Sequence, residues 1–305
     1  MTGVNARRDW AAVADDRRIT RRACGRALAY APVRFVRVGS YDDAVPTAPT
    51  SPAPTAPLAV RRVEPEVMDD PGLDPAAHRA ALTGLRRLNA VSGTTASLAR
   101  ALQPILSAVP AVRTPRVLDV ACGGGDGAVA LAQRLSILLR RTVEVDGCDL
   151  SPVAVAAANQ LALEAGLDAE FREADALAGP LPAPSLPDPG GERYDAAVSS
   201  LFLHHLEDDD APRVLRNMAA AANAVVISDL RRTRLGLAMA HVACRALSRS
   251  PVVHYDGPQS VRAAFTIEEF RRVADAAGLS GYEIRTVWPQ RFLFVWQQPA
   301  DGAAT

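Results

Sequence analysis

Three carboxylates in the middle of the chain have the spacing of a ligand-binding set. Asp119 lies inside an apolar run that leads into a glycine-rich turn, VLDVACGGGDG, at residues 117–127. Asp149 ends a second apolar run, VEVDGCD, and Asp175 follows a third, in FREADAL. If these runs are parallel strands, their carboxyl ends meet in one crevice, which is where ligands bind in open α/β sheets. We therefore expect the three acids to face one ligand.

The glycine-rich turn indicates a nucleotide or nucleoside ligand. Glycines let the backbone bend sharply and approach a ligand without interference from a Cβ atom. Gly123, Gly125 and Ala128 also satisfy G-x-G-x-x-A, the fingerprint of dinucleotide-binding turns. Asp119 argues against that ligand, since a carboxylate beside the turn repels a pyrophosphate and attracts an ammonium group. An oxidoreductase that uses NAD(P) therefore stands as an alternative, as does a non-catalytic binding module with the same fold.

The other two acids suit the rest of a nucleoside. Asp149 can accept hydrogen bonds from both ribose hydroxyls, and Asp175 can accept one from the adenine amino group. Each acid also has a structural interpretation. Asp119 can bond the backbone amides of the turn, Asp149 can cap the following helix, although Ser151 can do so instead, and Asp175 can be an exposed loop residue.

Histidines are the candidates for acid–base chemistry. His204 and His205 follow a fourth apolar run, and either can serve as a general base or simply form a wall of the site. His254 begins the sequence HYDG, which combines a base, a hydroxyl donor and a turn, so we predict a second candidate on a loop. His241 is more consistent with a partly buried helix residue. The four cysteines are scattered without metal-ligand spacing, so we expect no metal site.

Alternating strand and helix patterns must position these residues. Strands are predicted at 116–121, 143–149, 169–173, 194–200 and 224–230, and helices at 126–140, 152–165 and 212–222. This alternation predicts a Rossmann-like, doubly wound α/β domain with a parallel sheet and crossover helices. A last helix at 267–277 precedes two β-rich runs, 281–287 and 291–297, whose short connection near Pro289 predicts an antiparallel hairpin.

Two segments precede this domain. Residues 1–59 comprise an Arg-rich arm and a linker with five prolines between Pro46 and Pro57, and we expect them to be disordered. Residues 60–112 form a predicted helical lid. Its first helix has Asp74 as N-cap, Pro75 in the first turn and a leucine stripe, and its second spans 94–106; the stripe is Leu82, Leu85 and Leu88.

Composition excludes some classes of partner. The 34 basic and 34 acidic residues balance, which argues against a nucleic-acid-binding protein. The most apolar helical stretch, 235–247, is interrupted by His241 and Arg245 and is too short to span a bilayer. The N-terminus lacks the apolar run of a signal peptide. We expect a cytoplasmic protein, monomeric or homodimeric, that acts on a small molecule.

The motifs resemble those of one enzyme family, in its order and spacing. VLDVACGGGDG resembles the first motif of class I S-adenosylmethionine-dependent methyltransferases, CDLSPVAVAAA their ribose-binding segment, and EADA their adenine-proximal motif. YDAAVSSLFLHHL is similar to the fourth-strand segment of the small-molecule branch that includes ubiquinone and menaquinone methylation enzymes. FTIEEFRRVADAAGL with its hairpin resembles the family's last helix and reversed strand. The resemblance covers roughly residues 80–298 and implies a seven-stranded sheet of order 3-2-1-4-5-7-6.

The resemblance also implies a cofactor, S-adenosyl-L-methionine, and the residues that hold it. Asp119 and the turn would hold its methionine part, Asp149 and its neighbour the ribose, Asp175 and its neighbour the adenine, and two residues after the fourth strand would lie near the sulfonium. The implied cofactor-binding set is Asp119, Cys122, Gly123, Gly125, Asp149, Leu150, Asp175, Ala176, Ser200 and Leu201. Residues 113–298 would be the methyltransferase domain, in which the insertion 231–262 walls the acceptor pocket. The family branch favours a phenolic, quinone-like or polyketide-derived acceptor.

Overall fold

The computed structural model describes residues 58–70, 72–184 and 193–299. All of them fall in the compact unit Ala48–Thr305. The predicted arm, nearly all of the proline-rich linker and Cys24 lie outside the described ranges. The second half of the proline-rich loop at 179–191 also lies outside them.

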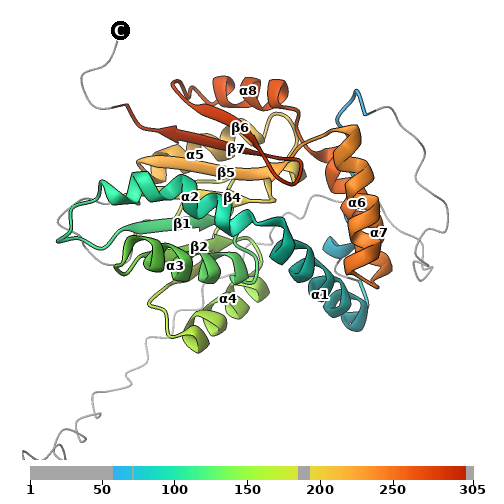
Figure 1. Cartoon of the computed structure of the whole chain (residues 1–305), viewed down its shortest axis with the longest axis horizontal. Helices are drawn as coiled ribbons and strands as arrows, with labels where there is room; N and C mark the ends of the chain where they lie inside the picture. The colour runs from blue at the N-terminus through green and yellow to red at the C-terminus, as the bar shows by residue number, and fades with distance from the viewer. Residues whose placement is uncertain (1–57, 71, 185–192, 300–305) are drawn as a thin grey trace, which may run out of the picture. The chain divides into compact units, whose positions relative to one another are not determined.

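A single seven-stranded sheet forms the centre of the described chain (Figure 1). Its order is β3-β2-β1-β4-β5-β7-β6. Strands β1 to β5 are parallel, whereas β7 runs antiparallel to both β5 and β6. The predicted fold class and the strand order implied by the family resemblance are therefore confirmed. The strands are β1 Arg116–Val120, β2 Glu144–Asp149, β3 Phe171–Glu173, β4 Ala196–Ser200, β5 Ala224–Leu230, β6 Glu283–Val287 and β7 Arg291–Gln297.

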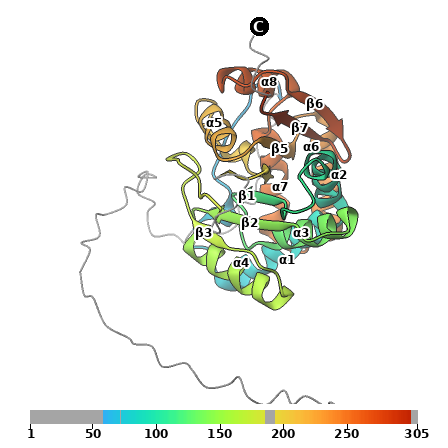
Figure 2. The same cartoon turned by 90° about the vertical axis from the view of Figure 1, so that its left-hand side faces the viewer.

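Helices cover both faces of the sheet (Figure 2). On one face the core contains almost only aliphatic side chains, as expected for a parallel sheet covered by helices. Most of the buried aromatic residues that the structure describes lie on the other face, where the ring centroid of Phe270 lies 4.5 Å from that of Phe292 and 5.4 Å from that of Phe294. The first face carries α2 Thr94–Ser107, α3 Asp126–Leu139 and α4 Pro152–Ala165, and the second α5 Ala211–Ala221 and α8 Ile267–Ala276.

A third group of helices packs beside the sheet, as Figure 1 shows, with its own small apolar core. It comprises α1 Pro75–Ser92, α6 Arg234–Leu247 and α7 Pro251–Ala263. The predicted start of α1 is confirmed, because Asp74 accepts a hydrogen bond from the backbone of Ala77. Gly84 of α1 lies so close to Ser248 that a Cβ atom there would be 2.8 Å from the Cβ of that serine. The close approach of these helices therefore depends on a glycine.

Two expectations for these helices need correction. Leu82 of the predicted leucine stripe is exposed, whereas Leu85 and Leu88 pack inward, because three-residue steps drift around a helix of 3.6 residues per turn. HYDG does not form a loop, since residues 254–257 lie inside α7. Within the predicted lid, α2 packs on the sheet and α1 stands away from it. No helix among the described residues has the length and apolarity needed to cross a bilayer.

Candidate functional site

The glycine-rich turn between β1 and α3 has the conformation that its sequence suggests. Gly123 and Gly125 have φ angles of +54° and +79°, in the left-handed region that favours glycine. A Cβ atom on Gly125 would lie 2.8 Å from the Cβ of Ala158 on α4, whereas one on Gly123 would meet nothing within 4 Å. The turn is thus packed against α4 on one side and open at Gly123. Cys122 anchors its start, with its amide donating to the carbonyl of Cys148 over 3.0 Å.

Asp119 is a buried carboxyl group beside this turn. Only 6% of its surface is exposed, and burial together with the nearby charge of Asp149 raises its pKa to about 7. No hydrogen bond from another described residue reaches its carboxylate, so it does not serve the turn's amides. A buried acid without a partner costs free energy in its charged form. It is therefore suited to a ligand that brings a positive charge.

Asp149 at the end of β2 braces the turn from the opposite side. One carboxylate oxygen accepts from the amide of Gly123 at 2.8 Å, and the other accepts from the amide of Ser151 at 2.9 Å. Ser151 itself caps α4 by accepting from the amide of Ala154 at 3.2 Å, so Asp149 is not the N-cap. Each carboxylate oxygen has a second lone pair available for a ligand hydroxyl. The neighbouring Leu150 is 66% exposed.

The remaining cofactor candidates lie at the carboxyl ends of neighbouring strands. Asp175, just after β3, is exposed and accepts from the amide of Leu177 at 2.8 Å, while Ala176 is buried. Ser200 ends β4, and Leu201 follows it with a φ of +57°. Since β3, β2, β1 and β4 are adjacent in that order, the structure brings the candidates to one edge of the sheet.

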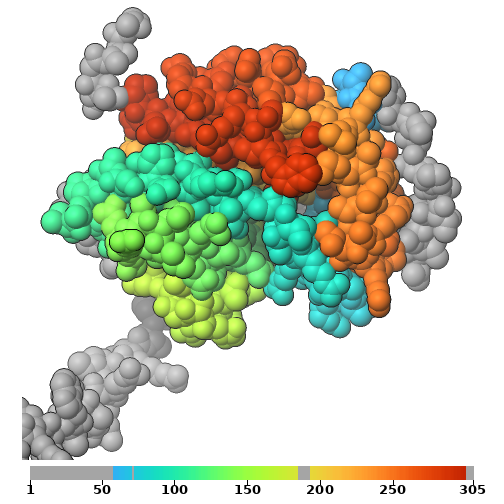
Figure 3. All heavy atoms as spheres, in the orientation of Figure 1, coloured from blue at the N-terminus to red at the C-terminus, as the bar shows by residue number. Residues whose placement is uncertain are grey.

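A cavity of about 520 Å³ lies next to this edge. Leu201 lines it together with apolar side chains of α1 and α6, including Leu85, Leu88 and Met239, and the β6–β7 turn closes one side with Trp288. In the space-filling view, the surface is hollowed between α1 and α6 (Figure 3). None of the three predicted acids lines this cavity. The crevice of the acids and the apolar cavity are thus neighbouring spaces, with Leu201 common to both regions.

His204 lies in the cavity wall and is oriented by a buried carboxylate. Its Nδ1 is 2.7 Å from Oδ1 of Asp229, and its backbone amide donates to the other oxygen of that carboxylate at 3.2 Å. Burial lowers the pKa of His204, but the charge and hydrogen bond of Asp229 outweigh burial and raise the pKa overall. Because Nδ1 is engaged by Asp229, Nε2 is the nitrogen left for another partner.

His205 also lines the cavity and stacks on His204, with ring centroids 4.3 Å apart. Its side chain is 34% exposed, and Nδ1 lies 3.9 Å from a carboxylate oxygen of Asp69. Burial and the neighbouring His204 lower its pKa to about 4. The ring is therefore neutral near pH 7 and able to donate an electron pair. Glu66, from the segment before α1, lies close to both rings.

The structure separates His254 from this site. Its Nε2 lies 2.8 Å from the carbonyl oxygen of Ser248, and its side chain does not line the cavity. The predicted loop position of His254 is wrong, since the residue lies on α7 and its ring is held against the end of α6. Gly257, Ser260 and Val261, farther along α7, are the residues of this helix that line the cavity.

Four cavity or support residues were missed by sequence reasoning. Arg61 donates to the carbonyl oxygens of His204 and Leu206 at 3.0 and 2.6 Å, and so ties residues 58–70 to the site. The other three are Glu66, Asp229 and Arg291. In the sequence, Asp229 and Arg291 are recognisable only as polar residues at the ends of two predicted strands. Arg61 and Glu66 are charged residues in a segment that has no helical or strand periodicity.

Comparisons with known proteins agree with this architecture. The sequence profile of a methyltransferase domain family matches residues 117–224. A ubiquinone biosynthesis O-methyltransferase from Pseudomonas entomophila is 32% identical over 120 residues, which are 38% of this chain and 45% of that protein. The chain therefore spans less than half the length of this curated relative.

Solved structures share the fold at low sequence identity. The plantazolicin methyltransferase BpumL, solved with S-adenosylhomocysteine (SAH) and a triazolic desmethylplantazolicin analogue, has a TM-score of 0.53 and 15% identity, over 74% of this chain and 92% of that one. An O-methyltransferase family 2 protein from Planctomyces limnophilus, solved with apigenin, has a TM-score of 0.50 and 17% identity, over 75% and 63%. Residues 117–224 thus match the methyltransferase domain family, in agreement with the resemblance seen in the sequence, and they lie within the complete seven-stranded fold described above.

Proposed function

We propose that this protein transfers a methyl group from S-adenosyl-L-methionine to a small-molecule acceptor. One observation carries the proposal. Asp119, a buried carboxyl group that accepts no hydrogen bond from the described residues, lies beside an open glycine turn at the edge of a sheet, and an apolar cavity adjoins that edge. The family match over residues 117–224 supports the same reaction.

The residues at the sheet edge fit this cofactor. Asp119 would pair with the ammonium group of its methionine part, because an opposite charge favours the ionised form of the buried acid. The open side of Gly123 leaves room for the ligand against the backbone. Asp149 would accept from the ribose hydroxyls, and Asp175 from the adenine. When bound, the cofactor supplies an activated methyl group on a cationic sulfur, which needs little further activation.

The apolar cavity would hold the acceptor. Its aliphatic walls favour a flat, largely apolar molecule, and its volume of about 520 Å³ is within the range of small-ligand pockets. Arg291 contributes a buried positive charge to the wall, and burial lowers its pKa only to about 10. A cation there stabilises a phenolate or a polarised carbonyl. These features favour a phenolic, quinone-like or polyketide-derived acceptor.

The chain's own contribution to the reaction would be alignment and proton handling. The cavity walls would hold the acceptor oxygen in line with the methyl group near Leu201, and such positioning contributes up to about 7–11 kcal/mol in favourable cases. His204, oriented by Asp229, would accept the proton that the acceptor hydroxyl loses. Methyl transfer to the acceptor oxygen would balance in this way, since the cofactor would supply the methyl group and keep the bonding electrons as a neutral thioether, while His204 would hold the proton.

The dinucleotide alternative is disfavoured by the same acid. A pyrophosphate at the turn would lie beside Asp119 and Asp149, and both carboxylates would repel it. Only the G-x-G-x-x-A pattern of Gly123, Gly125 and Ala128 supports binding of a dinucleotide. Fluorescence titration with NADH distinguishes the two proposals.

Incubation with methyl-labelled S-adenosylmethionine and a panel of phenols, hydroxyquinones and aliphatic hydroxy acids tests the proposal. We expect label to pass to one or more phenolic or quinone-like members and not to the aliphatic hydroxy acids. Transfer to aliphatic hydroxy acids alone would contradict the acceptor class. Binding of NADH, without any binding of SAH, would contradict methyl transfer itself.

A further inference from the structure

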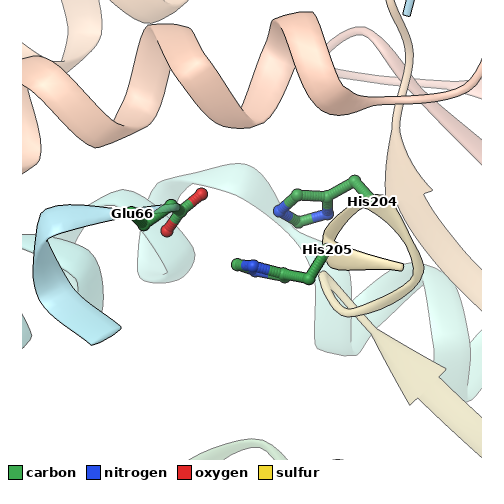
Figure 4. Close-up of side chains that lie close together, drawn as sticks. All are labelled: Glu66, His204 and His205. Carbon is green, nitrogen blue, oxygen red and sulfur yellow. The ribbon is translucent and has the colours of Figure 1, made fainter. Parts of the chain in front are cut away.

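Three electron-pair donors meet at the wall of the cavity. Glu66, His204 and His205 each offer one ligand atom, and these atoms lie within 4.8 Å of one another. Figure 4 shows both imidazole rings projecting from the same short turn toward the carboxylate of Glu66. That turn is the 3₁₀ helix η2, Leu203–His205, which follows β4, whereas Glu66 immediately precedes η1, Val67–Asp69. Two histidines and one carboxylate are a donor set that transition metals bind in proteins.

Asp229 gives His204 the orientation of a metal ligand. Nδ1 of His204 faces Oδ1 of Asp229 at 2.7 Å, so the proton of the neutral ring resides on Nδ1 and the lone pair on Nε2. A histidine that binds a metal commonly donates its other ring N–H to a carboxylate in this way, which fixes the tautomer and increases the basicity of the ligand. Asp229 is itself 1% exposed and positioned within β5, so the arrangement is rigid.

The other two donors are also held in place. The ring of His205 stacks on that of His204, with the ring centroids 4.3 Å apart, which holds the second imidazole beside the first. One oxygen of Glu66 accepts a hydrogen bond from the hydroxyl of Ser260 on α7, which leaves the other oxygen for the two rings.

The backbone around Glu66 is anchored as well. The amides of Val67 and Met68 donate to the carboxylate of Asp256 on α7, at 2.9 and 3.0 Å. Together with Arg61, which ties residues 58–70 to η2, these bonds fix the segment that carries Glu66 against the two histidines. The donor set is therefore assembled from two distant parts of the chain, the segment before η1 and the turn η2.

We propose that Glu66, His204 and His205 bind a divalent transition-metal ion, Zn²⁺ in particular, with an open coordination position toward the cavity. The expectation from the scattered cysteines, that the chain has no metal site, would then be wrong, because the ligands are not close in sequence. Metal binding here does not depend on methyl transfer. If the proposed function holds, an acceptor oxygen would take the open position, where the metal would lower its pKa. Because the metal and a proton use the same lone pair of His204, His204 would serve as the base only in metal-free protein, and in metal-bound protein the metal itself would activate the acceptor oxygen.

Titration of metal-stripped, full-length protein with Co²⁺ and Zn²⁺ tests this site. Mildly alkaline buffer is appropriate, because the metal must displace any proton on His204. We expect saturation at one Co²⁺ per chain with visible d–d absorption of nitrogen and oxygen ligation, and displacement of that Co²⁺ by Zn²⁺. Saturation accompanied by strong sulfur-to-cobalt absorption would overturn the proposal, since it would place the metal on cysteines.

Variants assign the ligands. Glu66→Gln removes the carboxylate ligand, and because the side chain is partly exposed we expect the variant to fold. Loss of a residue that only supports a ligand typically lowers metal affinity roughly 10- to 100-fold, so we expect the affinity of Glu66→Gln for Zn²⁺ to fall by at least that much. Asp229→Asn should lower affinity about 10- to 100-fold through His204 alone. His241→Asn, a half-buried histidine of α6 outside the cavity, is the matched control and should bind as the parent does. Unchanged affinity in Glu66→Gln, with the thermal transition intact, would overturn the site.

Discussion

Replacing Asp149 by alanine is expected to weaken the binding of SAH at least about tenfold, because hydrogen bonds to a charged group contribute about 1.5–3 kcal/mol each. The carboxylate would accept from the ribose and also braces the turn through the amide of Gly123. Both effects act on the cofactor site. Isothermal titration calorimetry of the parent and Asp149→Ala proteins with SAH measures the change.

A second aspartate on the same strand provides the control. Asp146 lies three residues before the end of β2, where it accepts from the hydroxyl of Tyr194 and from the amide of Glu170. Asp146→Asn keeps an acceptor there, so we expect an unchanged affinity for SAH. Equal affinities for the parent and Asp149→Ala proteins, with both folded by circular dichroism, would show that the ribose assignment is wrong.

The largest effect on turnover is expected at His204. His204→Asn keeps an amide N–H for the buried Asp229 but removes the Nε2 lone pair, so the buried carboxylate retains its partner. Loss of a general base typically costs 10²–10⁴-fold, and we expect kcat to fall by about 100-fold with little change in the affinity for SAH. The rate of label transfer to an acceptor found in the panel measures this.

His254 and the pH profile separate catalysis from structure. His254→Asn lies outside the cavity and should change kcat less than about twofold, although it loses the bond to Ser248. Because Asp229 raises the pKa of His204, the base is free only at higher pH, and kcat of the parent should rise with pH toward a plateau. If kcat falls equally in His204→Asn and His254→Asn, or stays unchanged in His204→Asn, then His204 is not the general base.

Much of the sheet was predictable from the sequence for a simple reason. Buried parallel strands are continuous apolar runs, and the helix after β2 is bounded by a capping serine, Ser151, and a glycine, Gly166. The predicted bounds of α4, β5 and β7 match those observed. The acids at the ends of β1, β2 and β3 were predictable too, since the strand pattern alone places them on one edge. The hydrogen bonds of these acids were not predictable from the sequence. For example, the amide of Gly123 donates to the carboxylate of Asp149, 26 residues away in the chain.

The helices around the cavity were harder to predict because packing overrides local preference there. HYDGP has the composition of a turn, yet residues 254–258 are helical. Gly257 allows α7 to lie directly against Cys244 of α6, and Pro258 lacks the N–H that would bond the carbonyl of His254. Burial of the α7 face outweighs the local cost.

The donor cluster was unpredictable for a different reason. Glu66 lies in a non-periodic segment, and only tertiary contacts through Arg61 and Asp256 bring it to the two histidines. A pattern search along the chain detects ligands that are close in sequence. It cannot detect a carboxylate supplied from outside the matched domain.

Calorimetric titration of the parent protein with SAH, at pH 6 and at pH 8, tests the central claim most directly. Burial and Asp149 raise the pKa of Asp119 to about 7, and the ammonium group of SAH would bind its ionised form. We therefore predict binding of one SAH per chain, tighter at pH 8 than at pH 6, with this difference lost in Asp119→Asn. Absence of binding at both pH values by the folded protein would contradict the account.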